Sequence, residues 1–547
     1  MNFIINESAQ KLRGGYYTPP ILADFISKWV FEGSAQNILE PSCGDGNFLE
    51  SINNQYHNSF NCINFTGIEF DEIEFAKCKK RASSCKNIKS NILHSDFLSW
   101  AITNLKSKPE YDAIIGNPPF IRYQYLPEEM QAEAETIFKF LDIKFTKHTN
   151  AWVPFVLASL HMLKPGGRFA MVLPAEILHV IHAQAVRSYM SKVCSKILIF
   201  DPEDIWFEDT LQGAVIVFAE KKQEQSIKSQ GLSIIQTRGM NFTQTDPSKY
   251  FNESIYKNGE TIKGKWTYAL LSDQEFNLYQ KILANKKVLN FIDIADVDVG
   301  IVTGANKFFL VNDEVVSQYN LDDYSYPMFG KSEHCQGIVY DELQHLANAK
   351  KGLPTNFIWF NSEHKHFNEL QKKYIASGEK QELQNRYKCR IRNPWYRVPS
   401  VYSTELCMLK RSHNIPRIIV NKMNAFTTDT AYRIKLKDSK IKPEQLASLF
   451  INSLTALSAE LEGRHYGGGV LELVPSEIEK LKIPIVKDVK ISIEELNLKV
   501  KRGANIVEIL ASQDLEILTR VGLSKYEITI LQNAWLKLKN RRQRTES

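Results

Sequence analysis

Short apolar runs alternate with longer amphipathic segments over the first 220 residues, a pattern that predicts strands alternating with helices. The helices are expected at Pro20–Phe31, from about Asn47 onwards, and at Trp152–Leu163. The runs expected to form buried strands are Asn37–Glu40, Phe65–Glu69, Asn91–Ser95, Tyr111–Ile115, Arg168–Leu173, Lys196–Phe200 and Ala214–Ala219. This alternation predicts an α/β fold, with a mostly parallel seven-stranded sheet and helices on both faces.

The pattern is less regular in the rest of the chain, where strands and helices are mixed and no internal repeat is visible. A stretch rich in Lys, Gln, Ser and Thr, from Glu220 to about Ser248, predicts a junction between domains. After residue 485 the apolar positions recur at helical spacing. We therefore expect a first domain over residues 1–248, a mixed α+β domain over 249–485 and a C-terminal helical segment over 486–547.

Composition places the chain among ordinary globular proteins, with 43% hydrophobic and 24% charged residues. The first residues lack the basic segment and apolar core of a signal peptide, and no apolar run is long enough to span a bilayer. The eight cysteines include no Cys-x-x-Cys pair, which argues against a zinc site and against a disulfide framework. These features predict a cytoplasmic protein without a bound metal and without a membrane partner.

Charge is distributed unevenly along the chain. Residues 1–220 contain 20 Lys and Arg against 25 Asp and Glu, a net charge of −5. The remaining residues contain 48 against 37, a net charge of +11. The second half is therefore the better candidate for binding a polyanion. A basic run, Lys539–Arg544, lies close to the C-terminus, and there we expect amphipathic helix packing rather than phosphate contacts.

The strongest chemical signal is Asn117-Pro118-Pro119-Phe120, which follows the strand Tyr111–Ile115. Open α/β sheets bind their ligands at the carboxyl ends of the strands, so this position suits an active site. The two prolines lack an N–H and hold the residues before them extended, which leaves backbone carbonyls free to accept hydrogen bonds. Two acceptors followed by an aromatic ring suit a planar amine. The alternative is an ordinary turn that ends a strand.

Glycine and acidic residues follow the earlier strands. The first strand leads into Pro41–Gly46 and a helix, which is how a Rossmann-like nucleotide-binding sheet begins, although the spacing is not that of the dinucleotide motif. The second ends in Glu69 and Asp71, placed to accept from ribose hydroxyls. The third ends in Asp96 and Phe97, suited to an adenine amino group and ring. Each acid alone is more often a helix cap or a solvated charge, but their order at successive strand ends favours a nucleotide site.

Five segments thus stand in a fixed order: Gly15-Tyr16-Tyr17-Thr18-Pro19, Leu39 to Gly46, Gly67-Ile68-Glu69, Ser95-Asp96-Phe97 and Asn117 to Phe120. In this order they resemble the DNA adenine-N6 methyltransferases of restriction-modification systems, which use S-adenosyl-L-methionine (AdoMet). The cofactor motifs precede the catalytic motif and a large domain follows, as in the gamma class of that family. The resemblance covers about residues 10–220 and implies a bacterial or archaeal protein.

The resemblance implies a set of residues around the cofactor. Glu69 would bind the ribose, Asp96 the adenine amino group, and the loop around Thr18 would lie near the methionine part. The full set implied for AdoMet is Tyr17, Thr18, Glu40, Gly44, Gly46, Glu69, Asp96, Phe97 and Asn117.

The resemblance also implies the catalytic residues. Asn117 and the Pro118 carbonyl would hold the target amine, with Pro119 stiffening the corner and Phe120 stacking on a flipped adenine. Many relatives have Tyr in place of Phe120, a change that keeps stacking and loses a hydroxyl contact. Phe207 resembles a second aromatic that packs on the base, and the alternative is a loop aromatic that caps the sheet edge.

Candidate DNA contacts lie mostly in the second half. Arg386–Arg397 interleaves five cations with three aromatics, and on a strand its alternate cations could follow a phosphate backbone or read guanine edges. The alternative is a solvated edge strand. Arg417–Asn421 is expected to form another strand, and parts of residues 290–485 weakly resemble a target-recognition domain. The candidate DNA-binding residues are Arg122, Tyr123, Arg390, Arg392, Trp395, Tyr396 and Arg397.

The combined expectation is a monomeric enzyme that methylates adenine N6 in double-stranded DNA, with a separate restriction endonuclease as a candidate partner. One alternative is an amine methyltransferase acting on RNA or protein glutamine, although those enzymes usually have small additional domains and lack the Thr18 segment. Another is a DNA-binding specificity subunit with a vestigial methyltransferase fold, against which the intact Asn117, Pro118 and Phe120 argue. Only a short segment precedes Tyr17, so we do not expect an amino-terminal nuclease domain.

Overall fold

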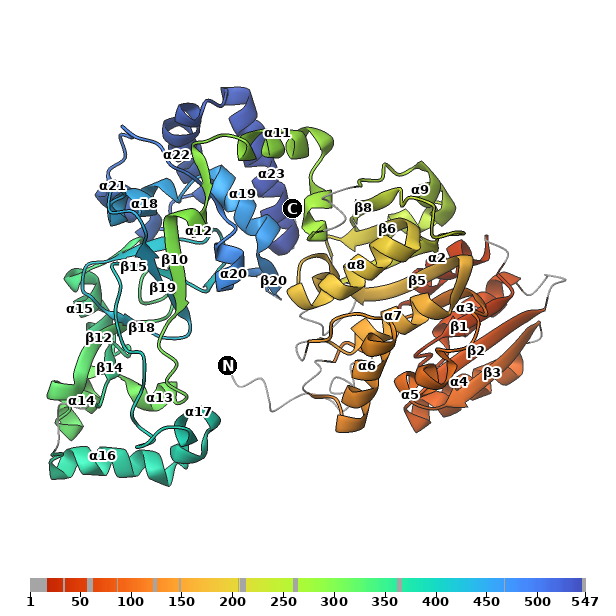
Figure 1. The fold of residues 1–547 in the computed structure, drawn as a ribbon, viewed down its shortest axis with the longest axis horizontal. Coiled ribbons are helices and arrows are strands. Elements are labelled where there is room, and N and C mark those ends of the chain that lie inside the picture. The colour runs from red at the N-terminus through yellow and green to blue at the C-terminus, as the bar shows by residue number, and fades with distance from the viewer. Residues whose placement is uncertain are drawn as a thin grey trace. The chain divides into compact units, whose positions relative to one another are not determined.

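A computed structural model describes residues 17–32, 35–56, 62–85, 87–121, 125–146, 149–204, 206, 213–258, 264–361, 366–466 and 468–543. The chain divides into two compact units, the first extending to Leu270 and the second running from Leu271 to Gln543 (Figure 1).

The first unit is built on an eight-stranded sheet in the order β3-β2-β1-β4-β5-β7-β6-β8. Its strands are β1 (Asn37–Glu40), β2 (Ile63–Glu69), β3 (Ile88–His94), β4 (Tyr111–Gly116), β5 (Leu163–Pro174), β6 (Cys194–Pro202), β7 (Ala214–Lys221) and β8 (Gly231–Thr237). The pairs are parallel except those of β7, which runs antiparallel to β5 and β6. All seven expected strands are confirmed. The eighth, β8, comes from the polar stretch that the sequence placed at the junction.

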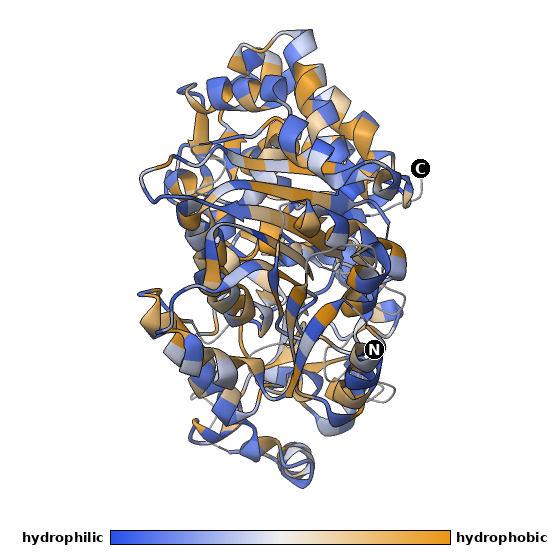
Figure 2. Ribbon diagram, turned by 90° about the vertical axis from the view of Figure 1, so that its right-hand side faces the viewer, coloured by the Kyte–Doolittle hydropathy of each residue, from blue (hydrophilic) through white to orange (hydrophobic). Residues whose placement is uncertain are grey.

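Both faces of this sheet are covered. Along β4, Ala113 and Ile115 belong to one apolar core and Ile114 belongs to the other, because successive side chains of a strand point to opposite faces. The helices are α2 (Pro20–Phe31), α3 (Asn47–Tyr56), α4 (Glu72–Ser84), α5 (Phe97–Asn104), α6 (Glu128–Phe140), α7 (Trp152–Met162), α8 (Gln184–Val193) and α9 (Pro247–Glu253). The strands of the large sheet carry long hydrophobic stretches in Figure 2, as strands buried on both faces should.

Helix α2 shows how the sequence produces one of these layers. Pro20 opens the helix, where its missing N–H costs nothing. Six apolar residues of α2 from Leu22 to Val30 are buried, and the Trp29 ring stacks on Phe218 of β7 with ring centroids 4.4 Å apart. The helix therefore packs directly on the sheet, with the bounds predicted from sequence.

The boundary between the units lies after Leu270 rather than after residue 248. Helix α9 packs against α2, and the short 3-10 helix η5 (Trp266–Leu270) packs beside β8. Trp266 is fully buried in the core of the first unit. The described part of residues 249–270 thus belongs to the first unit, where Phe251 and Trp266 are buried.

The second unit mixes strands and helices, as expected. Its main sheet has the order β10-β19-β15-β17-β13, and a second sheet has the order β11-β14-β12-β18. The strands are β9 (Val288–Asn290), β10 (Ala295–Val299), β11 (Leu310–Val311), β12 (Ser325–Phe329), β13 (Val339–Tyr340), β14 (Asn356–Ile358), β15 (Leu406–Leu409), β16 (Arg411–Ser412), β17 (Ile418–Asn421), β18 (Phe426–Thr427), β19 (Ala431–Leu436), β20 (Arg464–Tyr466), β21 (Val470–Glu472) and β22 (Lys482–Pro484).

Helices surround these sheets, and the C-terminal helices belong to the same unit. The helices are α11 (Asp273–Leu283), α12 (Phe291–Ile294), α13 (Asn306–Phe309), α14 (Asp313–Tyr319), α15 (Glu342–Lys350), α16 (Glu369–Lys380), α17 (Tyr387–Arg390), α18 (Pro443–Leu449), α19 (Ser453–Glu462), α20 (Pro475–Ile478), α21 (Ile493–Lys501), α22 (Ile506–Val521) and α23 (Lys525–Gln543). Helix α23 packs along α19 and α11, so residues 486–543 are part of the second unit.

The expected strand over Arg386–Arg397 is wrong. The segment forms the short helix α17 followed by turns. Within the segment only Cys389 and Trp395 are buried, whereas Tyr387 and Ile391, which a strand would place on the same face as these two, are 63% and 64% exposed. Pro394 also lacks the N–H that a sheet ladder needs.

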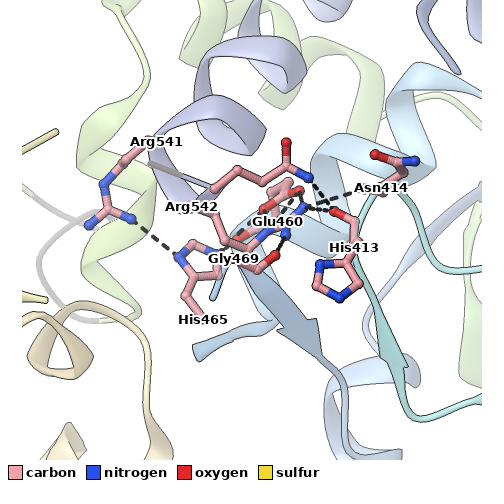
Figure 3. A network of polar contacts seen from close by, with 8 residues as sticks. His413, Asn414, Glu460, His465, Gly469, Arg541 and Arg542 are labelled. Carbon is pink, nitrogen blue, oxygen red and sulfur yellow. Dashed lines mark hydrogen bonds and ion pairs between the residues drawn. The ribbon is translucent and has the colours of Figure 1, made fainter. Parts of the chain in front are cut away.

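The basic C-terminal run is packed into the protein at Arg542, whose side chain is fully buried (Figure 3). Its guanidinium donates to both carboxylate oxygens of Glu460 on α19, at 2.8 and 2.9 Å. It also donates to the backbone carbonyls of Gly469 and His413. Helix packing, rather than a free phosphate-binding tail, is therefore confirmed here, and the ion pair ties α23 to α19 and to the β20–β21 hairpin.

We predict that Arg542→Met lowers the free energy of unfolding by about 3–5 kcal/mol, because it leaves the buried Glu460 carboxylate without its partner. Urea denaturation followed by circular dichroism measures this loss. Arg520→Met is the matched control, since Arg520 pairs with Glu516 on the surface of α22 and should cost at most about 1 kcal/mol. Equal losses in the two variants would contradict the role given to Arg542.

Candidate functional site

The carboxyl ends of four adjacent strands, β3, β2, β1 and β4, meet at one edge of the sheet and open into a cavity of about 720 Å³. Each strand end supplies a lining residue, namely Asp96, Glu69, Glu40 and Asn117. The volume suits a ligand of nucleotide size. The sequence-predicted cofactor and catalytic segments are thus brought together at one place.

The loop after β1 forms the floor of this site. Gly44 has φ +52° and lines the cavity, and a Cβ added there would meet nothing within 4 Å. Its N–H donates to Glu69 Oε2 at 2.8 Å. Gly46 has φ +91° and does not line the cavity. A Cβ at Gly46 would lie 3.1 Å from Cys78 Sγ, so this glycine allows α4 to pack closely against the loop.

Arg81 on α4 holds the same loop in place, a role that sequence reasoning missed. Its guanidinium donates to Asp45 at 2.9 Å and to the Asn47 side-chain oxygen at 2.5 Å. Asn47 in turn donates to the Thr18 carbonyl at 3.3 Å. The glycine loop and the segment ahead of α2 are therefore linked through one guanidinium. No local pattern reveals such a contact, because Arg81 is separated from Asp45 by 36 residues.

The acids at the ends of β2 and β3 make backbone contacts. Glu69 accepts from the N–H groups of Gly44 and Asp71, each at 2.8 Å, and burial raises the pKa of its carboxyl. The Asp71 side chain caps α4 and the Asp96 side chain caps α5. The helix-cap alternative is thus what the structure shows for these two aspartates, although both also line the cavity.

Three buried polar atoms of the cavity wall lack a hydrogen-bond partner within the described residues: Glu40 Oε2, Thr18 Oγ1 and Glu74 Oε2. Burial, followed by the nearby Cys78 and Glu69, raises the pKa of the Glu40 carboxyl well above its ordinary value. Leaving buried polar groups unpaired is costly. A ligand that carries hydrogen-bond donors and positive charge would satisfy these atoms.

The proline corner after β4 lies against the glycine loop. Asn117 and Pro119 line the cavity, and the Asn117 backbone carbonyl accepts from Ser42 Oγ at 3.0 Å. Pro118 is buried and Phe120 is half-buried, and neither lines the cavity. The Phe120 ring packs against both apolar cores of the sheet.

Apolar side chains line the rest of the cavity. Phe70 and Ile73 are 61% and 62% exposed although both are large and hydrophobic. Phe97, which was expected from sequence, is buried and lies 4.8 Å from Phe155 between ring centroids. Phe70, Ile73 and Phe155 were missed by sequence reasoning. The only local signal was Phe70 itself, an aromatic placed directly after the acid that ends β2.

The remaining expected residues of the first unit fall into two groups. Phe207, Arg122 and Tyr123 lie outside the described residues. Tyr17 and Thr18 line the cavity, and Lys77 Nζ lies 6.0 Å from the centroid of the Tyr17 ring.

The candidate DNA contacts in the second unit separate into two groups. Arg390 and Arg397 are exposed, and the Arg390 guanidinium lies 5.5 Å from the ring of Tyr387, itself 63% exposed. Arg392 instead donates to the carbonyls of Val302 and Thr303, both at 2.7 Å. The other two, Trp395 and Tyr396, pack in an aromatic core. Only the first group presents cations to solvent.

Within the described part of the chain, no group of three or more His, Cys, Asp or Glu side chains is placed to hold a metal ion. All eight cysteines are free. No helix among the described residues combines the length and the apolar character needed to cross a membrane.

Comparisons with known proteins agree with this site. A family model described as N-6 DNA Methylase matches residues 2–286, and one described as the C-terminal domain of Type II methyltransferase M.Eco57I matches residues 263–518. The chain is 28% identical over 487 residues to Type II methyltransferase M.AccI of Acinetobacter calcoaceticus, covering 85% of this chain and 84% of that protein. It is 27% identical over 356 residues to Type II methyltransferase M.BanIII of Aneurinibacillus aneurinilyticus, covering 55% and 58%.

Among solved structures, the chain is similar to the type IIL restriction-modification enzyme MmeI in complex with DNA. The TM-score is 0.56 at 11% identity, and the match covers 95% of this chain and 75% of that chain. At this identity the similarity is one of fold.

We predict that Glu40→Gln stabilises the ligand-free protein increasingly as the pH rises. A carboxyl whose pKa is raised by folding contributes stability that is complete below its unfolded pKa and is lost as the pH rises through its folded pKa. The thermal midpoint of wild type should therefore fall relative to that of Glu40→Gln as the pH rises above the unfolded pKa of about 4.3. Glu253→Gln, which removes an exposed carboxyl on α9, is the matched control. A pH-independent difference for Glu40→Gln would contradict the prediction.

Proposed function

The chain belongs to the N-6 DNA methylase family, and we propose that it transfers a methyl group from AdoMet to N6 of an adenine that is flipped out of double-stranded DNA. The observation that carries the proposal is the placement of Asn117 at the rim of the cavity that also holds the unpaired Glu40 and Thr18 atoms. A cofactor site and an amine-binding corner therefore share one cavity.

The residues present fit AdoMet, the cofactor that the family implies. The unpaired Glu40 oxygen suits a cofactor that carries an ammonium group and a sulfonium. Glu69 would accept from the ribose hydroxyls through the lone pairs that its two backbone contacts leave. Asp96 and the apolar side chains of Phe70, Ile73 and Phe97 would take the adenine. When bound, AdoMet supplies an electrophilic methyl group.

The chain's own part in catalysis is to position the amine. The exocyclic nitrogen of adenine is a poor nucleophile because its lone pair is delocalised into the ring. The Asn117 side-chain oxygen and the Pro118 carbonyl would accept its two hydrogens and so direct the lone pair into the cavity. Pro119 keeps the corner stiff, and the Ser42 hydroxyl fixes the Asn117 carbonyl.

This arrangement needs no strong base, because the amine proton becomes acidic once the methyl group has been transferred and can then pass to water. Positioning and electrostatics supply the rate enhancement. Phe120 and Phe207 are proposed to stack on the flipped base, which would offset part of the few kcal/mol that extrusion costs.

The second unit is proposed to hold the DNA. Its exposed cations at Arg390 and Arg397 would contact phosphates, with Arg122 and Tyr123 contributing near the catalytic corner. Arg392, Trp395 and Tyr396 would instead support this surface, since their side chains are engaged within the unit. The enzyme would act as a monomer, with a separate restriction endonuclease as its partner in a restriction-modification system.

We predict that Asn117→Ala lowers turnover by about 10²–10³-fold, because one of the two acceptors for the amine is lost. AdoMet affinity, measured by calorimetry without DNA, should stay within about threefold. Sequencing that detects modified bases should find N6-methyladenine at one recognition sequence in cells expressing wild type and none in cells expressing the variant. The control is Asn104→Ala, which removes a side-chain amide at the end of α5.

Unmethylated DNA in cells that express active wild-type protein would contradict the proposal in favour of an RNA or protein substrate. Normal turnover by Asn117→Ala would remove Asn117 from the mechanism.

We predict that DNA affinity falls steeply with ionic strength, and that Arg390→Ala reduces the slope of log K against log salt by about 1. Fluorescence anisotropy with a labelled duplex at several salt concentrations measures both. Arg502→Ala removes an equally exposed arginine from the helical region and should leave the slope unchanged. An unchanged slope for Arg390→Ala would exclude a phosphate contact by Arg390.

A further inference from the structure

A half-buried carboxylate that does not line the cavity lies directly after the strand next to β4. Glu176 belongs to the short 3-10 helix η2 (Ala175–Leu178), which begins where β5 ends. Its side chain is 16% exposed. Its Oε1 atom accepts from the Asn150 side-chain amide and from the Trp152 indole N–H, the latter at 3.0 Å. His182 Nε2 lies 3.6 Å from the same oxygen.

These contacts fix a segment that forms part of the cavity wall. Asn150 and Trp152 flank Ala151, whose N–H donates to the Ile121 carbonyl at 2.8 Å. Ala151 and Ile121 both line the cavity. Ile121 directly follows Phe120, so this hydrogen bond holds the far end of the proline corner. A continuous series of contacts therefore runs from Glu176 through residues 150–152 to the corner that begins at Asn117.

The acceptor in this series is a charged group in the folded protein. Burial alone would raise the pKa of Glu176, but His182, Trp152 and Asn150 together hold it below its ordinary value. Glu176 is therefore a carboxylate at neutral pH. An apolar side chain would fill the same space at less cost in desolvation, but it could not orient two donors at once.

We propose that Glu176 is a positioning residue for methyl transfer, which aligns the proline corner by holding Asn150 and Trp152 against it. The inference rests on the proposed function and concerns the same site. Glu176 touches neither the cavity nor the strand ends β1, β2 and β3 that carry the cofactor residues. Its loss should therefore lower turnover while leaving cofactor binding intact.

The first test compares Glu176→Ala with Glu176→Gln. The alanine variant loses the acceptor, and we expect kcat to fall about 10–100-fold, since a misplacement of about 1 Å can cost a factor of this size. AdoMet affinity without DNA should change less than about threefold. The glutamine variant keeps an oxygen that can accept from Asn150 and Trp152, and its kcat should lie within about threefold of wild type.

Asp112→Ala is the matched control for a loss of folding stability. Asp112 lies near the start of β4, at the end away from the cavity, and accepts from the Gln36 and Asn37 N–H groups and from Lys164. The Asp112→Ala variant loses three side-chain contacts, as Glu176→Ala does. Its kcat should nevertheless stay unchanged at temperatures where the protein is folded. A purely structural role for Glu176 would make the two variants alike and would overturn the proposal.

A second pair of variants keeps the test decisive if Glu176→Ala fails to fold. Asn150→Asp places two carboxylates together and should lower kcat at least tenfold. The double variant Asn150→Asp/Glu176→Gln exchanges the positions of the amide and the carboxylate. It should recover most of the kcat lost in Asn150→Asp, because the two side chains again form a donor–acceptor pair. Absence of recovery would overturn the proposal.

Hydrogen exchange separates this inference from the proposed function, because it requires no substrate. In the ligand-free protein, Glu176→Ala should speed amide exchange at Ala151 and its neighbours, and Glu176→Gln should not. If wild type fails to methylate DNA while exchange responds as expected, the proposed function fails and the positioning role stands. If wild type methylates DNA and exchange does not respond, only the positioning role fails.

Discussion

Parallel pairing of β3, β2, β1 and β4 is the constraint on which the rest of the first unit depends. The register sets Glu40 opposite Gly67 and Glu69 opposite His94, so the strands end nearly level with one another. Each chain segment that leaves this edge must turn before it can enter a helix. Residues far apart in the sequence are thereby gathered around one cavity, and the hydrogen bond from Gly44 to Glu69 joins two of the turns.

The parts of this arrangement that could be predicted from sequence are those with a local signature. Helix α2 has the bounds that its proline start and apolar spacing indicated, and the strand ends lie where the glycines and acids placed them. The strand over Arg386–Arg397 was wrong because its alternating cations are not matched by alternating buried residues. Burial of Cys389 and Trp395 in an aromatic core determines that segment, and no short pattern in the sequence shows it.

Contacts between distant residues were the other part that sequence reasoning missed. Asp96 was expected to face a ligand, and its side chain also caps α5. Whether a carboxylate at a strand end caps a helix depends on where the next helix begins, which the sequence alone does not show. Gly46 was expected beside the cofactor and serves the packing of α4. Arg81 and Glu176 gave no signal at all, since each acts on residues that come near it only after the sheet has formed.

The basic surplus of the second unit overstates the positive charge that it offers to a polyanion. Arg542 is buried against Glu460, while Arg433 and Arg417 donate to backbone carbonyls within the unit. These guanidinium groups satisfy carbonyls that irregular loops leave without partners. Arginine therefore serves two purposes in this unit, and only exposure separates a structural cation from one available at the surface.

The Ser42 hydroxyl joins the glycine loop to the backbone of Asn117. A ligand that orders one of these two loops should help to order the other through this hydrogen bond. By thermodynamic reciprocity, the gain in binding free energy is the same whichever of the two ligands binds first. In the proposed reaction, the cofactor and the nucleobase should thus favour each other's binding.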